Sequence, residues 1–486
     1  MTADQPHKDK FDKHGAYKDA ANNEGIKLVK SQNAASQQST SIRATGSERK
    51  QRSLATQPAP AQPERRKAPR AWETPPEPVP APQFDDYRRI VGDAEINELR
   101  FLARPLKGKT VKMVNSTAVG GGVAEMLNRL VPMLAELEVT THWDVITGGN
   151  DFFEVTKAFH NALHGTEYDL NRSAQEIFLA YNEQNRQRMQ FQEDVVVIHD
   201  PQPAALIRSK RDSPGRWVWR CHIDLSNPNP QVWGFLRPFI EQFDAAIFSS
   251  QSFARQLPIP QYLFFPCIDP LSEKNKELDD SYVQQICDEF GIDRSRPIIT
   301  QVSRFDRLKD PVGVVQAYKL ARKYVDCQLV LAGGGASDDP EGALVLKEVK
   351  EAVGSDPDVI ILDLPPWCAL QINALQRAST IIIQKSIKEG FGLTVTEALW
   401  KGKPTIAGAV GGIPNQVIHK LTGALVHSVE GCAYQIRYLL THPEFAAQLG
   451  RNGREHAKEN FLMTTNVRRW LLLLRVLMGE RTVSQA

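Results

Sequence analysis

Two glutamates, Glu389 and Glu397, stand eight residues apart around a glycine-rich turn. The isoleucines at 381–383 predict a buried parallel strand before the turn, and an apolar helical pattern follows it. This order places the turn at the carboxyl end of a strand, where open α/β sheets bind ligands. The helix start offers free backbone N–H groups and a positive dipole end, which suit a phosphate. The turn that should hold the phosphate consists of Gly390, Phe391, Gly392, Leu393 and Thr394.

The two carboxylates indicate a ligand that also carries hydroxyl groups. An ionised carboxylate only accepts hydrogen bonds, and sugar hydroxyls donate them. Glu397 lies about two helical turns beyond the glycines, so one carboxylate can face the reacting part of a ligand while the other reaches its far end. Taken singly, each glutamate is also typical of a solvated surface. The glycines between them and a second glycine turn at Gly411-Gly412 favour a nucleotide-sugar site.

Two cations, Arg304 and Lys309, follow another predicted strand that begins at Ile298. At the same sheet edge as the glutamate turn they can neutralise a pyrophosphate. As the C–O bond of a nucleotide sugar breaks, negative charge grows on the distal phosphate, and fixed cations stabilise that transition state. A basic pair is also typical of surface charge, and Arg307 is a neighbouring candidate. This interpretation requires no metal, and no Asp-X-Asp pair is clearly placed for one.

The segment from Glu389 to Glu397 resembles the EX7E motif of retaining family-4 glycosyltransferases, which have the GT-B fold. Four further segments are similar to the trehalose glycosyltransferring synthases within that group. They are residues 120–125, 155–161, 199–202 and 219–224. The resemblance covers roughly residues 86–480.

The resemblance implies two Rossmann-like α/β domains whose parallel sheets face each other across a cleft. It implies a retaining glucosyltransferase that makes α,α-trehalose from NDP-glucose and glucose, with no additional cofactor. UDP, ADP and GDP stay open as the nucleotide. Trehalose phosphorolysis and transfer to another acceptor are enzymatic alternatives, and nucleotide-sugar sensing is a non-enzymatic one. Glu397 favours a nucleotide over phosphate, because a ribose-holding carboxylate otherwise has no evident partner.

The resemblance also assigns roles to residues. Arg304 and Lys309 would hold the leaving pyrophosphate, and Glu397 the ribose hydroxyls. Glu389 would hold the donor glucose near its 3-hydroxyl, and His199 near its 6-hydroxyl. In this family the acceptor attacks from the front face and its proton passes to the leaving phosphate oxygen. A histidine at a strand end is otherwise typical of a structural residue.

Acceptor candidates lie in the amino-terminal half of the chain. Gly121 and Gly122 would let backbone approach the acceptor or the phosphate, although a simple helix-start turn explains them equally. Tryptophans near the remaining candidates suit sugar rings but also suit a core. The candidates are Gly121, Gly122, Lys157, Asn161, Arg220 and Asp224. A capped surface helix is an equally valid interpretation of Lys157 and Asn161.

Length and composition bound the domain organisation. The chain has 486 residues, too many for one ordinary domain, and hydrophobic residues make up 41%. Strand and helix patterns alternate in two series, which predicts two parallel sheets. We expect a disordered polar and proline-rich tail at 1–85, an acceptor domain at 86–275, a nucleotide-sugar domain at 276–462 and a helix at 463–486 that packs back on the first domain.

Charge and cysteine usage exclude several classes. The net charge of +2 gives no electrostatic case for nucleic acid. Six scattered cysteines show no zinc or disulfide spacing and fit a reducing, cytoplasmic compartment. Neither a signal peptide nor a run of about 20 apolar residues is present. The expected partners are therefore small-molecule substrates, without a membrane span, and a homodimer is compatible with these features.

Overall fold

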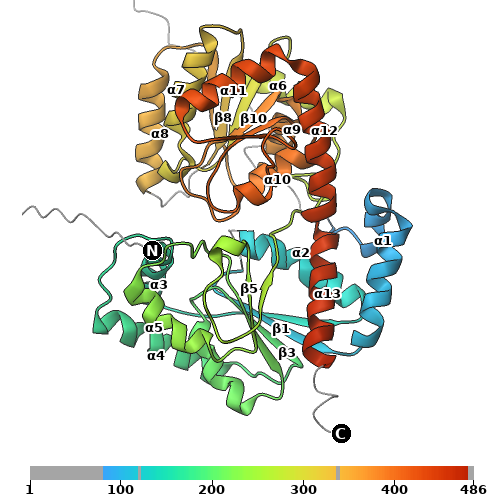
Figure 1. Cartoon of the computed structure of the whole chain (residues 1–486), viewed down its shortest axis with the longest axis vertical. Coiled ribbons are helices and arrows are strands. Elements are labelled where there is room, and N and C mark those ends of the chain that lie inside the picture. The colour runs from blue at the N-terminus through green and yellow to red at the C-terminus, as the bar shows by residue number, and fades with distance from the viewer. Residues whose placement is uncertain (1–79, 119–121, 335–339, 480–486) are drawn as a thin grey trace, which may run out of the picture. The chain divides into compact units, whose positions relative to one another are not determined.

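The computed structural model of the chain describes residues 80–118, 122–334 and 340–479, which form two six-stranded sheets. Every strand of both sheets pairs in parallel with its neighbours. Helices cover the sheets, as Figure 1 shows. This confirms the expected α/β class with two parallel sheets. Residues 1–79 of the expected tail lie outside the described residues.

The first sheet has the strand order β2-β1-β3-β4-β5-β6. Its strands are β1 (Thr110–Asn115), β2 (Thr140–Val145), β3 (Val195–His199), β4 (Arg216–Arg220), β5 (Ala245–Phe248) and β6 (Gln261–Leu263). Side chains alternate between the two faces, so Met113 and Val197 enter one core while Val114 and Ile198 enter the other. Both faces are apolar because helices bury both.

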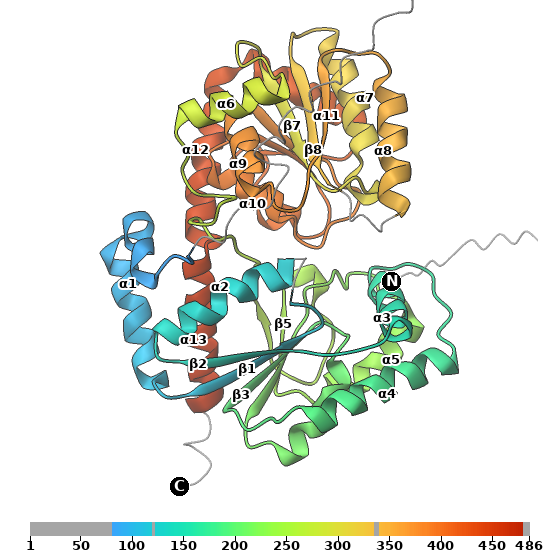
Figure 2. The same cartoon turned by 180° about the vertical axis from the view of Figure 1, so that it is seen from behind.

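Two layers of helices cover this sheet. One layer consists of α1 (Arg88–Ala103), α2 (Gly122–Glu136) and α13 (Met463–Gly479). The other consists of α3 (Asn150–Leu163), α4 (Arg172–Arg188), η3 (Ala204–Asp212) and α5 (Pro230–Ile240). Figure 2 shows the sheet between α2 and α13 on one side and α4 and α5 on the other.

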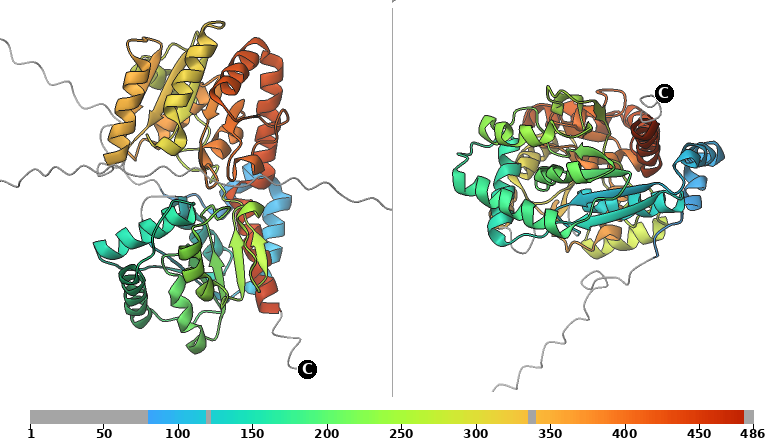
Figure 3. Two further views of the ribbon diagram at one scale, coloured as in Figure 1. Left: turned by 60° about the vertical axis from the view of Figure 1, so that its left-hand side comes forward. Right: turned by 90° about the horizontal axis from the view of Figure 1, so that it is seen from below.

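The last described helix, α13, belongs to the first core although it ends the chain. It lies beside α1, as both views of Figure 3 show. Trp470 is 1% exposed and meets the ring of Phe264 edge-on, with the ring centres 5.3 Å apart. The core also reaches further back than expected, because Phe84 in η1 (Phe84–Tyr87) is buried at 3% exposure. Ordered structure therefore begins before the expected boundary at residue 86.

The second sheet has the order β12-β11-β10-β7-β8-β9. Its strands are β7 (Ile298–Val302), β8 (Gln328–Gly333), β9 (Val359–Asp363), β10 (Ile381–Gln384), β11 (Thr405–Gly408) and β12 (Ala424–Val426). One face packs against α7 (Pro311–Arg322), α8 (Pro340–Val353), α11 (Val429–Thr441) and α12 (Pro443–Asn460), and the other against α6 (Asp280–Phe290) and α9 (Ala369–Ala378). The short helix α10 (Leu393–Trp400) follows β10.

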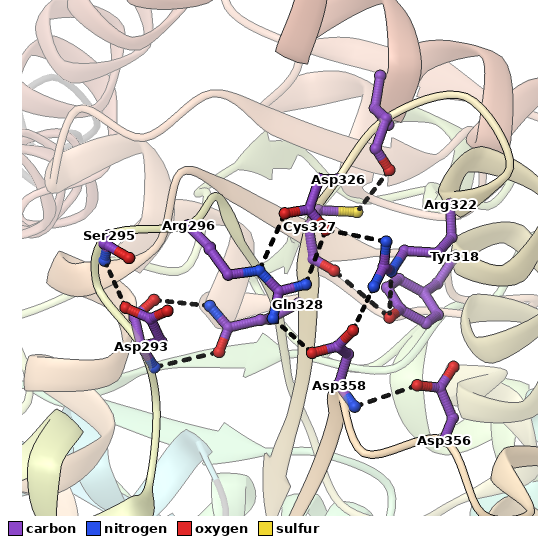
Figure 4. A network of polar contacts seen from close by, with 11 residues as sticks. Asp293, Ser295, Arg296, Tyr318, Arg322, Asp326, Cys327, Gln328, Asp356 and Asp358 are labelled. Atoms are coloured by element: carbon purple, nitrogen blue, oxygen red, sulfur yellow. Dashed lines mark hydrogen bonds and ion pairs between the residues drawn. The ribbon is translucent and has the colours of Figure 1, made fainter.

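A charged network joins the amino ends of β7, β8 and β9, at the sheet edge opposite the glutamate turn (Figure 4). The Arg296 guanidinium donates to both oxygens of Asp326 at 2.7 and 3.0 Å and also to Asp358. Arg322 of α7 donates to Asp358 as well and lies 2.8 Å from Asp326. Arg296, followed by Arg322, lowers the pKa of Asp358 to about 2. The network thus links the residues that precede β7, β8 and β9 to helix α7.

Asp358→Asn should lower stability, because two arginines lose a carboxylate whose side chain is only 19% exposed. Such a charged contact contributes about 1–2 kcal/mol, so the melting temperature should fall by a few degrees. A lowered pKa stabilises the fold above the unfolded value of about 3.9, and this contribution is lost as the pH falls toward 2. The difference in melting temperature between wild type and variant should therefore shrink in acid.

The matched control is Glu176→Gln, whose ion pair with Arg172 is largely exposed. It should change the melting temperature by less than about one degree. Equal effects of the two variants, or a difference that stays constant down to pH 2, would contradict this role of the network.

Candidate functional site

The glutamate turn lies between β10 and α10, as the sequence predicts. Gly392 adopts φ +83, and a Cβ atom there would stand 3.1 Å from Cγ of Glu389. Gly411, in the turn after β11, adopts φ +53, and its Cβ would stand 1.6 Å from the carbonyl oxygen of Glu389. Both positions therefore favour glycine, since a side chain would crowd the Glu389 side chain from Gly392 and collide with the Glu389 backbone from Gly411.

Adjacent strands bring the two expected charge clusters together. β10 pairs with β7, so the turns that follow these strands meet at one sheet edge. The amide of Ile387 donates to the carbonyl of Leu308 at 2.8 Å. Lys309, at the end of η5 (Arg307–Lys309), then places its Nζ 2.6 Å from Oε2 of Glu389. Ser386 Oγ donates to the same carboxylate oxygen at 3.2 Å.

The two arginines near Lys309 differ in their contacts. The Arg304 side chain is 61% exposed, and its Nη2 lies 3.1 Å from Oδ2 of Asp306. Arg307 forms a two-pronged ion pair with Glu348 of α8, at 2.6 and 2.9 Å. Arg304 can therefore turn toward a ligand, while Arg307 is already bound.

Glu397 is buried inside the protein at 2% exposure. Gln376 of α9 donates to its Oε2 at 3.2 Å, and the Lys274 ammonium lies 3.6 Å from its Oε1. The side chain of Phe391, in contrast, is buried in the core. Its ring stacks on Phe265 with centres 6.2 Å apart, so Phe391 anchors the turn in the core.

Two histidines at the ends of β3 and β4 differ in their exposure to solvent. His199 is fully buried, with Nδ1 3.0 Å from Nε2 of His222 and its own Nε2 3.4 Å from the sulfur of Met113. His222 is half-buried, and its carbonyl oxygen would lie 3.6 Å from a Cβ atom on Gly390. His222 therefore stands next to the glutamate turn, with His199 behind it.

Asp200 completes this cluster. It adopts φ +64, and its Oδ1 accepts a hydrogen bond from the His222 amide at 2.7 Å. Burial raises the pKa of Asp200 to about 6, against the opposing effects of the His222 amide and Arg220. Burial and then Arg220 lower the pKa of His199 to about 3 and also lower that of His222. Both imidazoles are therefore neutral at physiological pH.

The acceptor candidates occupy different environments. Gly122 begins α2, where a Cβ atom would lie 3.5 Å from Cδ1 of Leu393, and Gly121 lies outside the described residues. Lys157 and Asn161 are exposed on α3. Arg220 is 2% exposed and donates to Ser249 Oγ at 3.2 Å and to the Phe264 carbonyl at 2.6 Å. Asp224 is 5% exposed, and its Oδ1 accepts from the Ser226 amide at 2.8 Å.

Three further contacts were not foreseen from the sequence. Lys388, beside Glu389, donates its ammonium to the His164 carbonyl at the end of α3. Burial, followed by the charge of His160, lowers the pKa of His164 to about 4. Lys274 reaches Glu397 from the segment before α6. His222 lies inside the motif at residues 219–224, and that position was its only signal.

The arrangement combines a cation and a carboxylate at a turn with a helix start, a buried second carboxylate and a neutral histidine pair. The site therefore contains groups that can bind a phosphate, sugar hydroxyls and a ribose. Within the described residues, no helix has the length and apolarity needed to cross a membrane.

Comparison with known proteins identifies the family. Residues 113–255 match the family described as trehalose synthase, N-terminal domain, and residues 284–456 match glycosyl transferases group 1. The trehalose synthase of Thermococcus litoralis is 44% identical over 400 residues, covering 81% of this chain and 96% of the relative. The trehalose phosphorylase of Pleurotus pulmonarius is 30% identical over 453 residues, covering 80% of this chain and 60% of the relative.

Solved structures agree on the fold. The α,α-trehalose 6-phosphate synthase of Burkholderia multivorans superposes with a TM-score of 0.62 at 15% identity, covering 78% of this chain and 99% of that one. The Anabaena protein HepE, in complex with UDP and glucose, gives 0.57 at 15% identity, covering 76% and 100%. The chain therefore belongs to the trehalose synthase family of GT-B glycosyltransferases, and it is a trehalose-related hexosyltransferase.

Proposed function

We propose that the enzyme transfers glucose from NDP-glucose to free glucose and so forms α,α-trehalose. The observation that carries this proposal is the 2.6 Å contact between Lys309 and Glu389 at the turn before α10. It places a cation for the leaving phosphate beside a carboxylate for the transferred sugar. The relatives named trehalose synthase support glucose as the acceptor.

The leaving group is stabilised by Arg304, Lys309 and the amides of the turn from Gly390 to Thr394. Negative charge grows on the distal phosphate as the glycosidic bond breaks, and fixed cations and amides beside it stabilise that charge. Arg304 would exchange its contact with Asp306 for the phosphate, since its side chain is largely exposed. UDP, ADP and GDP all present the same phosphates. A solved relative that holds UDP and glucose supports a nucleotide-sugar donor.

The two glutamates bind different parts of the donor. Glu397 holds the ribose hydroxyls from within the second domain. Glu389 holds the transferred glucose near its 3-hydroxyl, and Lys309 and Ser386 fix its orientation. Neither carboxylate acts as a nucleophile in this scheme.

We assign the histidine contact with the transferred sugar to His222 rather than His199. His222 is the half-buried member of the pair and lies beside Gly390, whereas both ring nitrogens of His199 face protein atoms. A neutral imidazole can donate one hydrogen bond to the sugar while its other nitrogen faces His199. His199 then positions His222.

The acceptor glucose binds between the start of α2 and the end of β4. We assign Asp224, the backbone at Gly122 and the exposed side chains of Lys157 and Asn161 to this acceptor site. Arg220 stabilises this region through its hydrogen bond to Ser249 Oγ.

The transfer then runs in one step on the front face of the donor sugar. The anomeric hydroxyl oxygen of the acceptor forms a bond to C1 of the donor glucose while the bond from C1 to the phosphate oxygen breaks. The acceptor proton passes to that phosphate oxygen, so the products are NDP and trehalose and no protein base is needed. Exclusion of water favours glucose as the acceptor.

Phosphorolysis of trehalose is the second candidate, which the relationship to the Pleurotus phosphorylase supports. In that reaction inorganic phosphate would take the place of the nucleotide. Glu397 argues for the nucleotide, because a buried carboxylate with a ribose-holding role has no partner in phosphate alone.

Product analysis tests the function. Incubation with glucose and UDP-, ADP- or GDP-glucose should yield a non-reducing disaccharide with both anomeric carbons in the α configuration, read by proton NMR. A parallel incubation of trehalose with inorganic phosphate should yield no glucose phosphate. A reducing-end signal, free glucose alone, or efficient phosphorolysis would overturn the proposal.

Substitution of the cations tests the leaving-group role. Arg304→Ala and Lys309→Ala should each lower kcat about 10²–10³-fold, the usual loss for one preorganised electrostatic contact. Arg307→Ala is the matched control, since its guanidinium is bound to Glu348, and it should retain most of the activity. Normal turnover in both test variants would remove these cations from the site.

Substitution of the glutamates tests the division of the donor. Glu397→Gln should weaken NDP binding in calorimetry, while Glu389→Gln should mainly lower kcat. The two side chains sit at opposite ends of the bound donor, so each variant should affect one property. Unchanged NDP affinity in Glu397→Gln would refute the ribose assignment.

A further inference from the structure

One ammonium lies between carboxylates from the two halves of the chain. Lys274 Nζ is 3.3 Å from both carboxylate oxygens of Glu125 in α2 and 3.6 Å from Oε1 of Glu397 in α10. The starts of these two helices also touch, since Gly122 lies against the Leu393 side chain. Lys274 therefore stands at the place where the first and second domains meet beside the proposed ribose site.

The segment that carries Lys274 is fixed to the second domain. Asn373 donates to the carbonyls of Glu273 and Lys276 at 3.0 and 2.8 Å. Trp400 and Lys401 bond the backbone and side chain of Asn275 at 3.3 and 3.0 Å. Lys274 is thus held against α9 and α10, and its distance to Glu397 does not depend on the position of the first domain.

The two carboxylates near Lys274 differ in their exposure to solvent. The Glu125 side chain is 54% exposed and borders a cavity of about 500 Å³, whereas the Glu397 side chain is 2% exposed. An exposed ion pair in water contributes little, because solvent screens it. A buried carboxylate, in contrast, depends strongly on its nearby cation. Lys274 therefore matters more for the state of Glu397 than for that of Glu125.

A second lysine lies near Glu397 but does not replace Lys274. Burial lowers the pKa of Lys401 to about 7, against the opposing charge of Glu397, and its Nζ bonds Asn275. Glu397 is the largest influence that raises the pKa of Lys274 above its usual range. Lys274 is therefore the ammonium that more readily keeps its charge beside Glu397, while Gln376 contributes a neutral donor on the other side.

We propose that Lys274 is a positioning residue for nucleotide recognition, which orients the Glu397 carboxylate toward the ribose 2′- and 3′-hydroxyls. The inference rests on the proposed function, because it assumes that Glu397 holds the ribose. Lys274 does not touch the reacting atoms. Its loss weakens donor binding and leaves the transfer step largely intact.

The test is calorimetric binding of NDP to the full chain at pH 8, with the nucleotide among UDP, ADP and GDP that wild type binds most tightly. Lys274→Met should raise Kd about tenfold or more, the factor expected for one charge-assisted contact. Lys274→Arg should recover most of the affinity. In steady state, Lys274→Met should raise the donor KM more than it lowers kcat.

The 2′,3′-dideoxy form of the same nucleotide supplies the discriminating probe. It lacks the hydroxyls that Glu397 would hold, so wild type and Lys274→Met should bind it equally. Lys276→Met changes a lysine of the same segment that pairs with Glu273, and Glu125→Gln removes the exposed carboxylate. Both controls should keep the NDP affinity within about twofold of wild type.

Several outcomes would overturn the inference. One is wild-type NDP affinity in Lys274→Met while Glu397→Gln binds weakly, which would leave the proposed function standing. Another is an equal loss of affinity for NDP and its dideoxy form, which would mean that Lys274 acts elsewhere. Unchanged affinity in Glu397→Gln as well would refute the ribose assignment itself.

Discussion

The contact between the Lys309 ammonium and the Glu389 carboxylate is the interaction on which the candidate site depends. It forms because β7 and β10 are neighbours in one parallel sheet, so that the turns after both strands end at one place. Gly392 and Gly411 provide the room, since a side chain at either would collide with Glu389. A break in any of these features would separate the Lys309 ammonium from the Glu389 carboxylate.

The first domain meets this contact with groups that depend on the same geometry. β3 and β4 are paired, so His199 and His222 at their ends lie side by side, and Asp200 bonds the His222 backbone. Burial keeps both imidazoles neutral, which suits hydrogen bonding to a sugar better than proton transfer. Lys388 bonds the carbonyl of His164 and so links the glutamate turn to the first domain.

The sequence predicts much of this architecture because strand and helix patterns are strong in buried parallel sheets. Strand ends locate Lys309, Glu389 and the histidine motif correctly. The sequence does not indicate which of two histidines is buried, because that depends on the partner strand. Phe391 has a side chain that packs in the core, although its backbone belongs to the turn.

Long-range contacts are a second limit on prediction. Lys274 approaches Glu397 across 123 positions of the chain, and no local pattern marks it. The short strands β6 and β12 have three residues each, too few for a clear period.

A double-mutant cycle of Lys309→Met and Glu389→Gln tests the central claim, with kcat for glucose transfer as the readout. We predict that the double variant is about as slow as the slower single variant, because the pair acts as a unit. Losses that multiply would contradict the account.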